Sequence, residues 1–350
     1  MPQLTPRADA GLYSREVRVI SGAELETAPC LVCGGKRARP RFAIDGIAAQ
    51  VVECEGCGLG RFHPVLGAQE IRAFYPDEYY GEPGAKFQPV IERLVRLIGA
   101  RHIGFLSRGL ARGSRVLDVG CGRGVVLGPL ADRGLEVHGV EVSAAAARGA
   151  DPRAEIRIAP HLRDAGYPDA WFDEVIIWHV LEHLDDPRAT LLEAARVLRP
   201  GGRIIVAVPN FESWQARWSG AAWFHLDLPR HLYHFPLRAL RMLLEDTGFE
   251  VGESHHFSLR QNPFGWIQSA LNRVPGLPRN GLYTLLHQRA RREPTPFGVG
   301  MRVWLLALFA ATAPFALALS LAETLGKSGA TVHVAAIRRG APTRPASSRA

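Results

Sequence analysis

The sequence predicts a doubly wound α/β fold built on one seven-stranded parallel sheet, and three observations support this prediction. Short runs rich in β-branched residues alternate with helical stretches. A glycine-rich turn, Asp118–Gly124, joins the first run to the next helical stretch, and Pro200-Gly201-Gly202 stops a later helix. Strands joined by helices in this order pair in parallel. The expected strands are 115–119, 135–140, 155–159, 173–178, 203–208, 250–257 and 331–337.

Two helices are recognisable from their ends. Asp186 is expected as the N-cap of a helix from Pro187 to Leu198, because its carboxylate can accept an amide hydrogen bond and proline fits the first helical position. A second helix, 236–246, is expected to end at Gly248. These helices would follow the fourth and fifth strands of the predicted sheet.

The glycine-rich turn has the pattern of a nucleotide-cofactor loop. Glycines at positions 120, 122 and 124 let the backbone turn tightly and approach a ligand with no Cβ in the way, while the following helix offers its N-terminus. Glu141 lies at the end of the next strand, 21 positions after Gly120, where a carboxylate can accept hydrogen bonds from both ribose hydroxyls. NAD is disfavoured because Val125 stands where the dinucleotide pattern needs glycine or alanine.

The pattern Asp-x-Gly-x-Gly-x-Gly with a later glutamate resembles motif I of class I S-adenosylmethionine (SAM) methyltransferases. In that class the cofactor carries an amino acid and a sulfonium, and Asp118 suits its cationic group. The other interpretation is a glycine turn in an unrelated α/β domain. The resemblance implies cofactor contacts from Asp118, Gly120, Cys121, Gly122, Gly124, Glu141, Val142, Leu162, Trp178 and His179.

Three further phrases resemble the small-molecule branch of this superfamily. They are Phe172–Val175, Leu181–His183 and Arg196–Gly202, which match its FDxV, LEH and RVLxPGG signatures, and the resemblance covers about 110 to 260. Pro160-His161 replaces the Gly-Asp often found at the adenine contact, which leaves the backbone of Leu162 for that role. The segment 178–181, Trp-His-Val-Leu, lacks the Asn/Asp-Pro-Pro-Tyr sequence of enzymes that methylate nucleic acids and proteins.

Four of the five cysteines form two Cys-x2-Cys pairs, 30/33 and 54/57, with twenty residues between them. A glycine follows each pair, so four thiolates can converge tetrahedrally on a structural zinc ion held by Cys30, Cys33, Cys54 and Cys57. Two disulfides or a redox pair are the alternatives, and a reducing cytoplasm opposes the disulfides. A zinc ribbon followed by 74–81 and a SAM core resembles a bacterial group that includes sugar methyltransferases for cell-envelope polysaccharides.

In that group the N-terminal unit packs over the catalytic cleft, which implies that Tyr75, Tyr79 and Tyr80 either contact the acceptor or seal an interdomain contact. A hydroxyl acceptor also needs a base, and histidine suits this role. The segment 229–235 resembles a PRHLxHF sequence common in the group. The preferred base is His231, with Asp227 to orient it and Arg230 to bind an acceptor phosphate or carboxylate. The further candidates are His179, His183, His225 and His234, each of which could instead be structural.

The segment 303–322 has twenty residues without a charge and meets the length criterion for a membrane span. If 331–337 is the seventh strand beside the sixth, a single span would separate it from the sheet. Pro314 instead suggests an apolar hairpin or bent helix in one leaflet, near basic residues from Arg289 to Arg302, with a dimer interface as the alternative. The expected units are a zinc ribbon (1–70), a linker and helix (71–112), a SAM-binding core (113–258), an insertion (259–330), a final strand (331–338) and a disordered tail (339–350).

Together these features predict a methyltransferase that moves a methyl group from SAM to a hydroxyl, or with less support a carbon, on a sugar or lipid-linked envelope intermediate. A quinone-type phenol at the membrane and a non-catalytic binding module are the alternatives. The excess charge of +8 includes no long basic run interleaved with aromatics, so no nucleic-acid partner is expected. The N-terminus lacks a signal-peptide core, which places the protein in the cytoplasm, peripheral on the inner face of the membrane.

Overall fold

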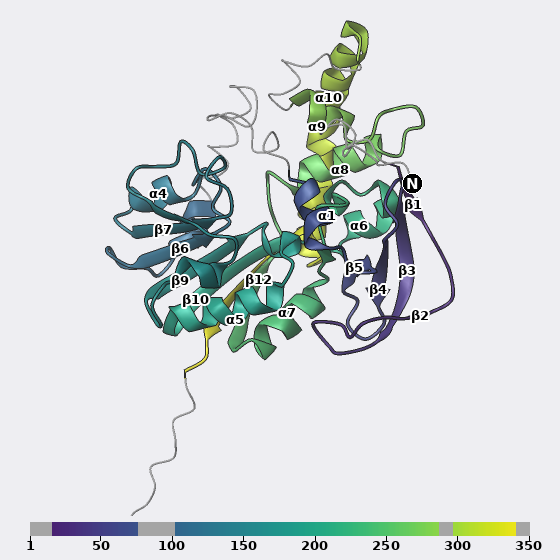
Figure 1. Ribbon diagram of the computed structural model, residues 1–350. Helices are drawn as coiled ribbons and strands as arrows, with labels where there is room; N and C mark the ends of the chain where they lie inside the picture. Colours follow the sequence, from purple (N-terminus) through teal and green to yellow (C-terminus); the bar gives the residue numbers. More distant parts are fainter. Residues whose placement is uncertain (1–15, 76–101, 287–296, 341–350) are drawn as a thin grey trace, which may run out of the picture.

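The structure is a computed structural model that describes residues 16–75, 102–286 and 297–340. Tyr79, Tyr80, the expected tail beyond 340 and the basic residues 289–292 lie outside the described residues. Two sheets organise the chain, a small one formed mainly by the N-terminal region and a larger one formed by the rest (Figure 1). The cavity that matters for function is lined by the larger unit and the C-terminal helices.

The larger sheet has seven strands within the described residues, in the order β12-β13-β10-β9-β6-β7-β8. Its strands are β6 (Arg115–Val119), β7 (Glu136–Glu141), β8 (Glu155–Ile158), β9 (Phe172–Trp178), β10 (Leu198–Pro209), β12 (Phe249–His255) and β13 (Thr331–Arg338). The seven expected strands are thus confirmed, including the place of the last beside the sixth. This is the strand order of a Rossmann-like methyltransferase sheet.

The prediction of an all-parallel sheet is wrong for β13, which pairs antiparallel with both β10 and β12. The reason is the edge of the sheet at which the chain returns after the insertion. The amide of Asn210, just after β10, donates to the carbonyl of Ala330 at 2.9 Å, so the chain returns at the carboxyl edge of the sheet. A strand that starts at this edge must run opposite to its neighbours.

Helices cover both faces of this sheet, so its central strands are apolar without alternation. On one face α5 (Pro187–Val197) and α7 (Leu237–Asp246) pack against Val175 and Ile204. On the other, the short helix α4 (Leu127–Ala131) packs against Ile176 and Ile205. Asp186 caps α5 as predicted, accepting from the amide of Ala189 at 2.9 Å.

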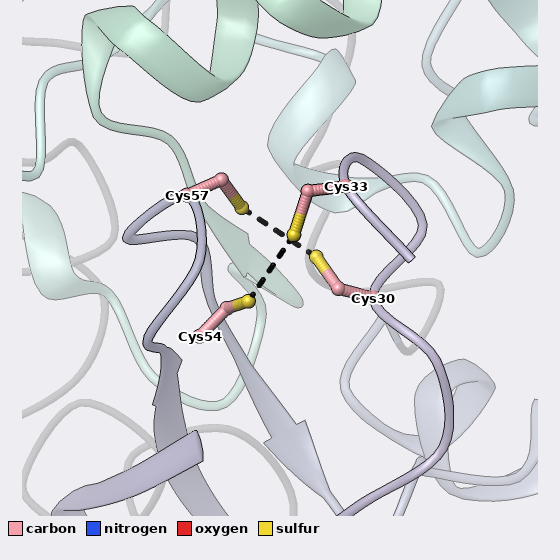
Figure 2. A group of neighbouring side chains, drawn as sticks. All are labelled: Cys30, Cys33, Cys54 and Cys57. Atoms are coloured by element: carbon pink, nitrogen blue, oxygen red, sulfur yellow. Dashed lines mark hydrogen bonds between the residues drawn. The ribbon is translucent and has the colours of Figure 1, made fainter. Parts of the chain in front are cut away.

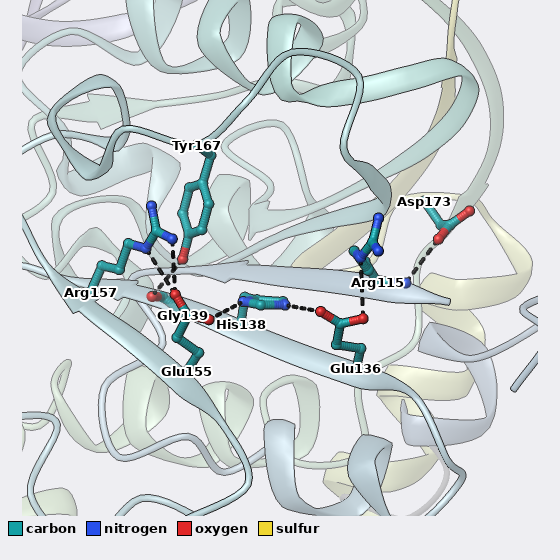
Figure 3. Close-up of polar contacts among 8 residues, drawn as sticks. All are labelled: Arg115, Glu136, His138, Gly139, Glu155, Arg157, Tyr167 and Asp173. Atoms are coloured by element: carbon teal, nitrogen blue, oxygen red, sulfur yellow. Dashed lines mark hydrogen bonds and ion pairs between the residues drawn. The ribbon is translucent and has the colours of Figure 1, made fainter. Parts of the chain in front are cut away.

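Polar contacts fix β7 at the end away from the glycine loop (Figure 3). The ring of His138 lies between two glutamates, with Nε2 3.1 Å from Glu136 and Nδ1 3.5 Å from Glu155. The hydroxyl of Tyr167 donates to the carbonyl of Gly139 at 3.4 Å. These contacts join β7 to β8 and to the segment before β9, and so hold the strand that ends at Glu141.

The smaller sheet has the order β1-β3-β4-β5-β11, with β2 paired to β3. Its strands are β1 (Val17–Val19), β2 (Leu25–Glu26), β3 (Arg37–Ile44), β4 (Gln50–Cys54), β5 (Gly60–His63) and β11 (Tyr233–His234). The segment between the two cysteine pairs forms the hairpin β3–β4. The last strand, β11, comes from the catalytic region, so one sheet joins the N-terminal unit to the core.

Short elements connect the sheets. They are α1 (Ala68–Ala73), η1 (Leu162–Ala165), η2 (Leu181–His183), α6 (Trp214–Ser219), η3 (Gly220–Ala222) and η4 (Phe224–Leu226). The insertion before β13 contains α8 (Asn262–Leu271), α9 (Gly281–Leu286) and α10 (Val299–Leu325).

The apolar segment forms a single helix of 27 residues, α10, which continues through Pro314 and rises above the body of the molecule (Figure 1). Of the two expected forms, an apolar hairpin or a bent helix, the hairpin is therefore wrong and the segment is helical. One end of the helix is anchored by buried Ala316, Ser320 and Glu323, and α10 packs along α8. Of the helices in the described residues, this one is long and apolar enough to cross a membrane, with a mean hydropathy of 2.1, although only length and composition indicate this.

Candidate functional site

A cavity of about 590 Å³ opens beside the glycine-rich loop, where β6 and β9 end. Three parts of the chain line it: the loop with the end of β9, the segment 224–231, and the insertion. The lining residues include Gly120, Cys121, Gly122, Trp178, His179, Glu182, His183, His225, Asp227, His231, Phe264, Tyr283 and Phe309. A topological switch point between neighbouring strands of an open α/β sheet is where ligands of such folds bind.

The loop needs its first glycine for a steric reason. Gly120 has a φ of +70°, and a Cβ there would lie 2.6 Å from Cγ2 of Val180. The amides of Gly120 and Cys121 both donate to the carbonyl of Val140, at 2.8 and 3.1 Å, which closes the turn. The helix does not follow at once, because turns fill 122–126 and α4 begins only at Leu127. The backbone of the loop therefore faces the cavity, and the N-terminus of a long helix does not.

Two buried carboxylates lie behind this loop. Glu141 accepts hydrogen bonds from the amides of Gly122, Val142 and Ser143, at 2.9, 2.8 and 3.1 Å. Burial, with the nearby charge of Glu141, raises the pKa of Asp118 to about 8. A buried acid in this state is suited to a cationic partner, which would lower its pKa again. Glu141 thus fits the ribose of SAM, and Asp118 fits its amino group.

Not all predicted cofactor residues line the cavity. Gly120, Cys121, Gly122, Trp178 and His179 do. Asp118, Gly124, Glu141, Val142 and Leu162 lie outside its lining, with Leu162 buried in η1 and Val142 exposed after β7. Their role in binding the cofactor remains a prediction.

Trp178 and His179 end β9 at the edge of the cavity. The indole of Trp178 stacks on the ring of His333, with centroids 4.6 Å apart, which fixes its plane. His179 has a φ of +54°, unusual for this residue, and burial lowers its pKa to about 3. The neutral imidazole Nδ1 lies 3.4 Å from Glu182 Oε1.

His183 and His231 lie with their ring centroids 4.6 Å apart in the cavity wall. The Nδ1 of His231 donates to the carbonyl of His225 at 2.9 Å, which leaves Nε2 as the proton acceptor. Burial holds the pKa of His231 well below its ordinary value, so the ring is neutral. Asp227 opposes this effect, with Oδ2 3.8 Å from Nε2, and would stabilise the protonated ring during proton transfer.

Other predicted residues of this segment lie differently. Arg230 lines the cavity but is buried, and its Nη2 donates to Asp227 Oδ1 at 2.6 Å, so its expected role in binding an acceptor phosphate or carboxylate stays a prediction. His234 lies outside the cavity lining, in β11, near Phe211. His225 lines the cavity, and burial lowers its pKa to about 3. Geometry therefore favours His231 and His183 over His234 as the base.

The four N-terminal cysteines converge (Figure 2). Their sulfurs all lie within 4.8 Å of one another, with Cys30 and Cys57 3.6 Å apart and Cys33 and Cys54 3.5 Å apart. The hydrogen bond from Cys57 lowers the pKa of Cys30 to about 5, which favours a thiolate. The donor set and its compactness suit Zn²⁺.

The two cysteine turns have the same geometry. After each pair a glycine adopts a positive φ, +70° at Gly34 and +78° at Gly58, and its amide donates to the carbonyl of the first cysteine at 2.8 Å. Buried Arg61 also donates to the carbonyl of Ala28 at 2.7 Å, two residues before Cys30. This guanidinium would offset part of the double negative charge of a tetrathiolate zinc centre.

The sequence did not identify the apolar part of the cavity. Phe264 and Ile267 come from α8, Tyr283 and Leu286 from α9, and Phe309 from α10. These positions carry no motif. The only available signal was the hydrophobicity of the insertion, which the sequence analysis assigned to a membrane or a dimer and not to the cavity.

Comparison with known proteins agrees with this site. The family model for a methyltransferase domain matches residues 91–254. A ubiquinone biosynthesis O-methyltransferase of Maricaulis maris is 32% identical over 171 residues, covering 46% of this chain and 66% of the relative. The O-methyltransferase rstn1 of Aspergillus nomiae is 31% identical over 190 residues, covering 50% of this chain and 80% of the relative. The chain belongs to the SAM-dependent methyltransferases.

The first relatives are matched over about two fifths to two thirds of their own length. Among solved structures, a SAM-dependent methyltransferase from Archaeoglobus fulgidus shares 18% sequence identity, with a TM-score of 0.44 over 70% of this chain and 94% of that chain.

Proposed function

We propose that this enzyme transfers the methyl group of SAM to a hydroxyl of an amphipathic acceptor, with a quinone-type phenol as the favoured head group. The observation that carries this proposal is the mixed lining of the cavity. Neutral histidines and Asp227 line it together with Phe264, Ile267 and Phe309 of the insertion. An acceptor with a hydroxyl on its head and a hydrocarbon tail would satisfy both kinds of side chain. Relatives named for ubiquinone biosynthesis agree with this acceptor class.

The residues present suggest a mechanism. When bound, SAM supplies an electrophilic methyl group on a sulfonium. Asp118 and Glu141 would hold its amino group and ribose, and Gly120 and Gly122 would let the backbone approach it. The hydroxyl is then oriented in line by the cavity, and His231 Nε2 removes its proton while Asp227 stabilises the resulting imidazolium. The apolar wall excludes water from the reacting atoms.

A lipid-linked sugar from the cell envelope is the second candidate, supported by the zinc-ribbon resemblance. It has the same amphipathic character. The pairing of Arg230 with Asp227 gives it less support, because this arginine is not left over for a phosphate on the acceptor. Methylation at carbon and a non-catalytic role have no supporting contact in the cavity.

We also propose that α10 holds the enzyme on the cytoplasmic face of a membrane. Val303 is 62% exposed, Trp304 46% and Phe315 68%, which leaves large side chains of this helix in contact with solvent in the isolated chain. The same helix contributes Phe309 to the cavity, so an apolar tail could pass from the lipid to the histidines along one element. A dimer that covers this face is the competing explanation.

Turnover with matched acceptors tests the proposal. Purified protein is given SAM and catechols that differ only in an alkyl tail of zero, five or ten carbons, and methylated product is detected by mass spectrometry. We expect kcat/KM to rise with tail length. In Phe309→Ala it should fall only for the catechols that carry a tail. Methylation of an undecaprenyl-linked sugar, but of none of the catechols, would replace the phenol by the second candidate.

Binding to vesicles tests the membrane proposal. The protein should sediment with vesicles containing phosphatidylglycerol, and brominated lipid should quench the fluorescence of Trp304, with Trp304→Phe as the control. A concentration-dependent dimer that does not bind vesicles would contradict it.

A further inference from the structure

We propose that the zinc ribbon is a positioning element of the methyl-transfer site, holding His231 and His183 through one strand pair and one tyrosine hydroxyl. Zinc-ribbon units are often separate structural modules, whereas this one contacts the segments that carry residues of the cavity wall. The inference rests on the proposed role of these histidines in methyl transfer. Its test reads structure and cofactor binding, so its outcome does not depend on the identity of the acceptor.

The first contact is the pairing of β5 with β11. β5 begins three residues after Cys57, and its Arg61 and Gly60 pair with Tyr233 and His234. A Cβ at Gly60 would lie 2.9 Å from Cβ of His234, so the two strands approach closely. β11 therefore starts two residues after His231, and a shift of β5 would move the loop that carries this ring.

The same loop is also tied to the end of β9. The amide of Leu232, between His231 and β11, donates to the carbonyl of Glu182 at 2.8 Å. The ribbon strand β5 and Glu182, the residue beside His183, thus both hold the loop that carries His231, which we call the histidine loop, where it enters β11. Neither contact involves the glycine loop.

The second contact is made by Tyr75, at the end of the N-terminal unit. Its ring packs with a cluster that includes Phe62 of β5 and Leu66. Its hydroxyl donates to the carbonyl of Arg230 at 3.2 Å and lies 2.8 Å from Nδ1 of His183. This Nδ1 also lies 3.2 Å from the Arg230 carbonyl, which can only accept, so it carries the proton. Nε2 of His183 is left as the proton acceptor.

The metal site is joined to the core at both cysteine turns. Arg238 of α7 donates to the carbonyl of Gly56 at 2.6 Å, and Arg188 of α5 approaches the carbonyl of Leu31 at 3.5 Å. Cys54 and Cys57 are buried in the same apolar cluster as the large sheet. Zinc would therefore fix β5 relative to α5 and α7, and through β11 it would fix the histidine loop.

Hydrogen exchange measured by mass spectrometry tests the first contact. The full chain is compared as purified, after zinc removal by a chelator, and as Cys57→Ser, with exposed Val19→Ala in β1 as the control that keeps all four cysteines. Metal content is measured in each sample. We expect exchange in 228–236 to quicken about ten-fold or more without zinc, while 115–119 stays protected and SAM affinity by calorimetry changes less than about three-fold.

Three results would overturn the inference. One is an as-purified chain without metal. Another is zinc loss that quickens exchange only in 30–57, which would make the ribbon an independent module. The third is loss of protection throughout the chain together with loss of SAM binding, which would make zinc a requirement of the whole fold.

Tyr75→Phe tests the second contact, because it removes only the hydroxyl. Long-range proton–nitrogen spectra of ¹⁵N-histidine should show His183 protonated at Nδ1 in both chains, because the Arg230 carbonyl still accepts this proton, and the Nδ1 resonance should shift in Tyr75→Phe, with zinc content unchanged. Tyr233→Phe is the control, since its hydroxyl donates to the Asp185 carbonyl at 3.2 Å instead. An unaltered His183 spectrum in Tyr75→Phe would contradict the role of this tyrosine.

Discussion

The cofactor end and the acceptor end of the site are built in different ways. The cofactor end comes from one strand, one loop and the next strand, all within 118–141, and its loop lines the cavity. The acceptor end combines the end of β9, the histidine loop, three helices of the insertion and, through Tyr75, the N-terminal unit. A local arrangement leaves a motif in the sequence, because its spacing is set by a single turn. An arrangement from distant segments leaves none, because each residue is placed by the packing of a different element.

Replacing Glu141 is the strongest way to test the cofactor end. Glu141→Ala should weaken SAM binding by about 2–4 kcal/mol, since it removes charge-assisted hydrogen bonds to the ribose and also releases the amide of Gly122. Titration calorimetry measures the change. Exposed Glu155→Ala on the neighbouring strand is the control and should bind normally. Equal affinity in Glu141→Ala would refute the assignment of the ribose contact.

Removing the preferred base tests the acceptor end. His231→Ala should lower the rate of catechol methylation about a hundred-fold, because the base acts on the acceptor proton. The affinity for SAM should stay within a few-fold. Since burial holds the pKa of His231 below its ordinary value, the wild-type rate should show no loss from protonation of this ring down to pH 6. His255→Ala, in β12 and outside the cavity lining, is the control.

A different outcome would move the role. If His183→Ala loses activity and His231→Ala does not, the base lies at the end of β9. Glu182, His183 and His231 also present polar atoms within 4.8 Å of one another. These three residues could therefore hold a metal ion. To test this, the rate should be measured with and without a chelator that leaves the cysteine site loaded.

Truncating the apolar wall should have a smaller effect, limited to the tail of the acceptor. Phe309→Ala removes one aromatic side chain from the cavity, and we expect KM for a ten-carbon catechol to rise about ten-fold with kcat nearly unchanged. Phe315→Ala, on the same helix but exposed, is the matched control. If both variants behave alike, α10 contributes to membrane binding or stability and not to acceptor recognition.

The comparison also explains which predictions from the sequence succeeded. All seven strands of the large sheet, the Asp186 cap and the convergence of the four cysteines follow from local patterns, and the structure confirms them. The direction of β13 was missed because it depends on where the insertion rejoins the sheet. The apolar helix was identified as a segment, but its place in the cavity wall depends on how α8 and α9 pack against it.

Single residues of the acceptor end show the same limit. The sequence suggested that Arg230 would bind an acceptor, and the structure adds that this residue lines the cavity while paired with Asp227. It suggested His234 as a possible base, whereas pairing with β5 directs this residue to the junction with the ribbon. Both residues belong to a recognisable phrase, but the phrase does not say which partners their side chains have.

The last expected effect concerns Asp118, and it links the cofactor end to pH. Burial raises the pKa of this carboxyl to about 8, far above its value in an unfolded chain. Between about pH 4 and 8 the folded chain without cofactor therefore binds more protons at this site than the unfolded chain, so its contribution to stability falls as the pH rises. The slope is at most about 1.4 kcal/mol per pH unit for one proton. Asp118→Asn should remove this slope in denaturant titrations at several pH values, and the variant should be the more stable chain near pH 8. SAM, whose cationic amino group favours the ionised carboxylate, should release a proton on binding at pH 7 in the wild type and none in Asp118→Asn. Calorimetry in two buffers of different ionisation enthalpy measures that proton directly, and equal proton release by both chains would mean that Asp118 does not face the amino group.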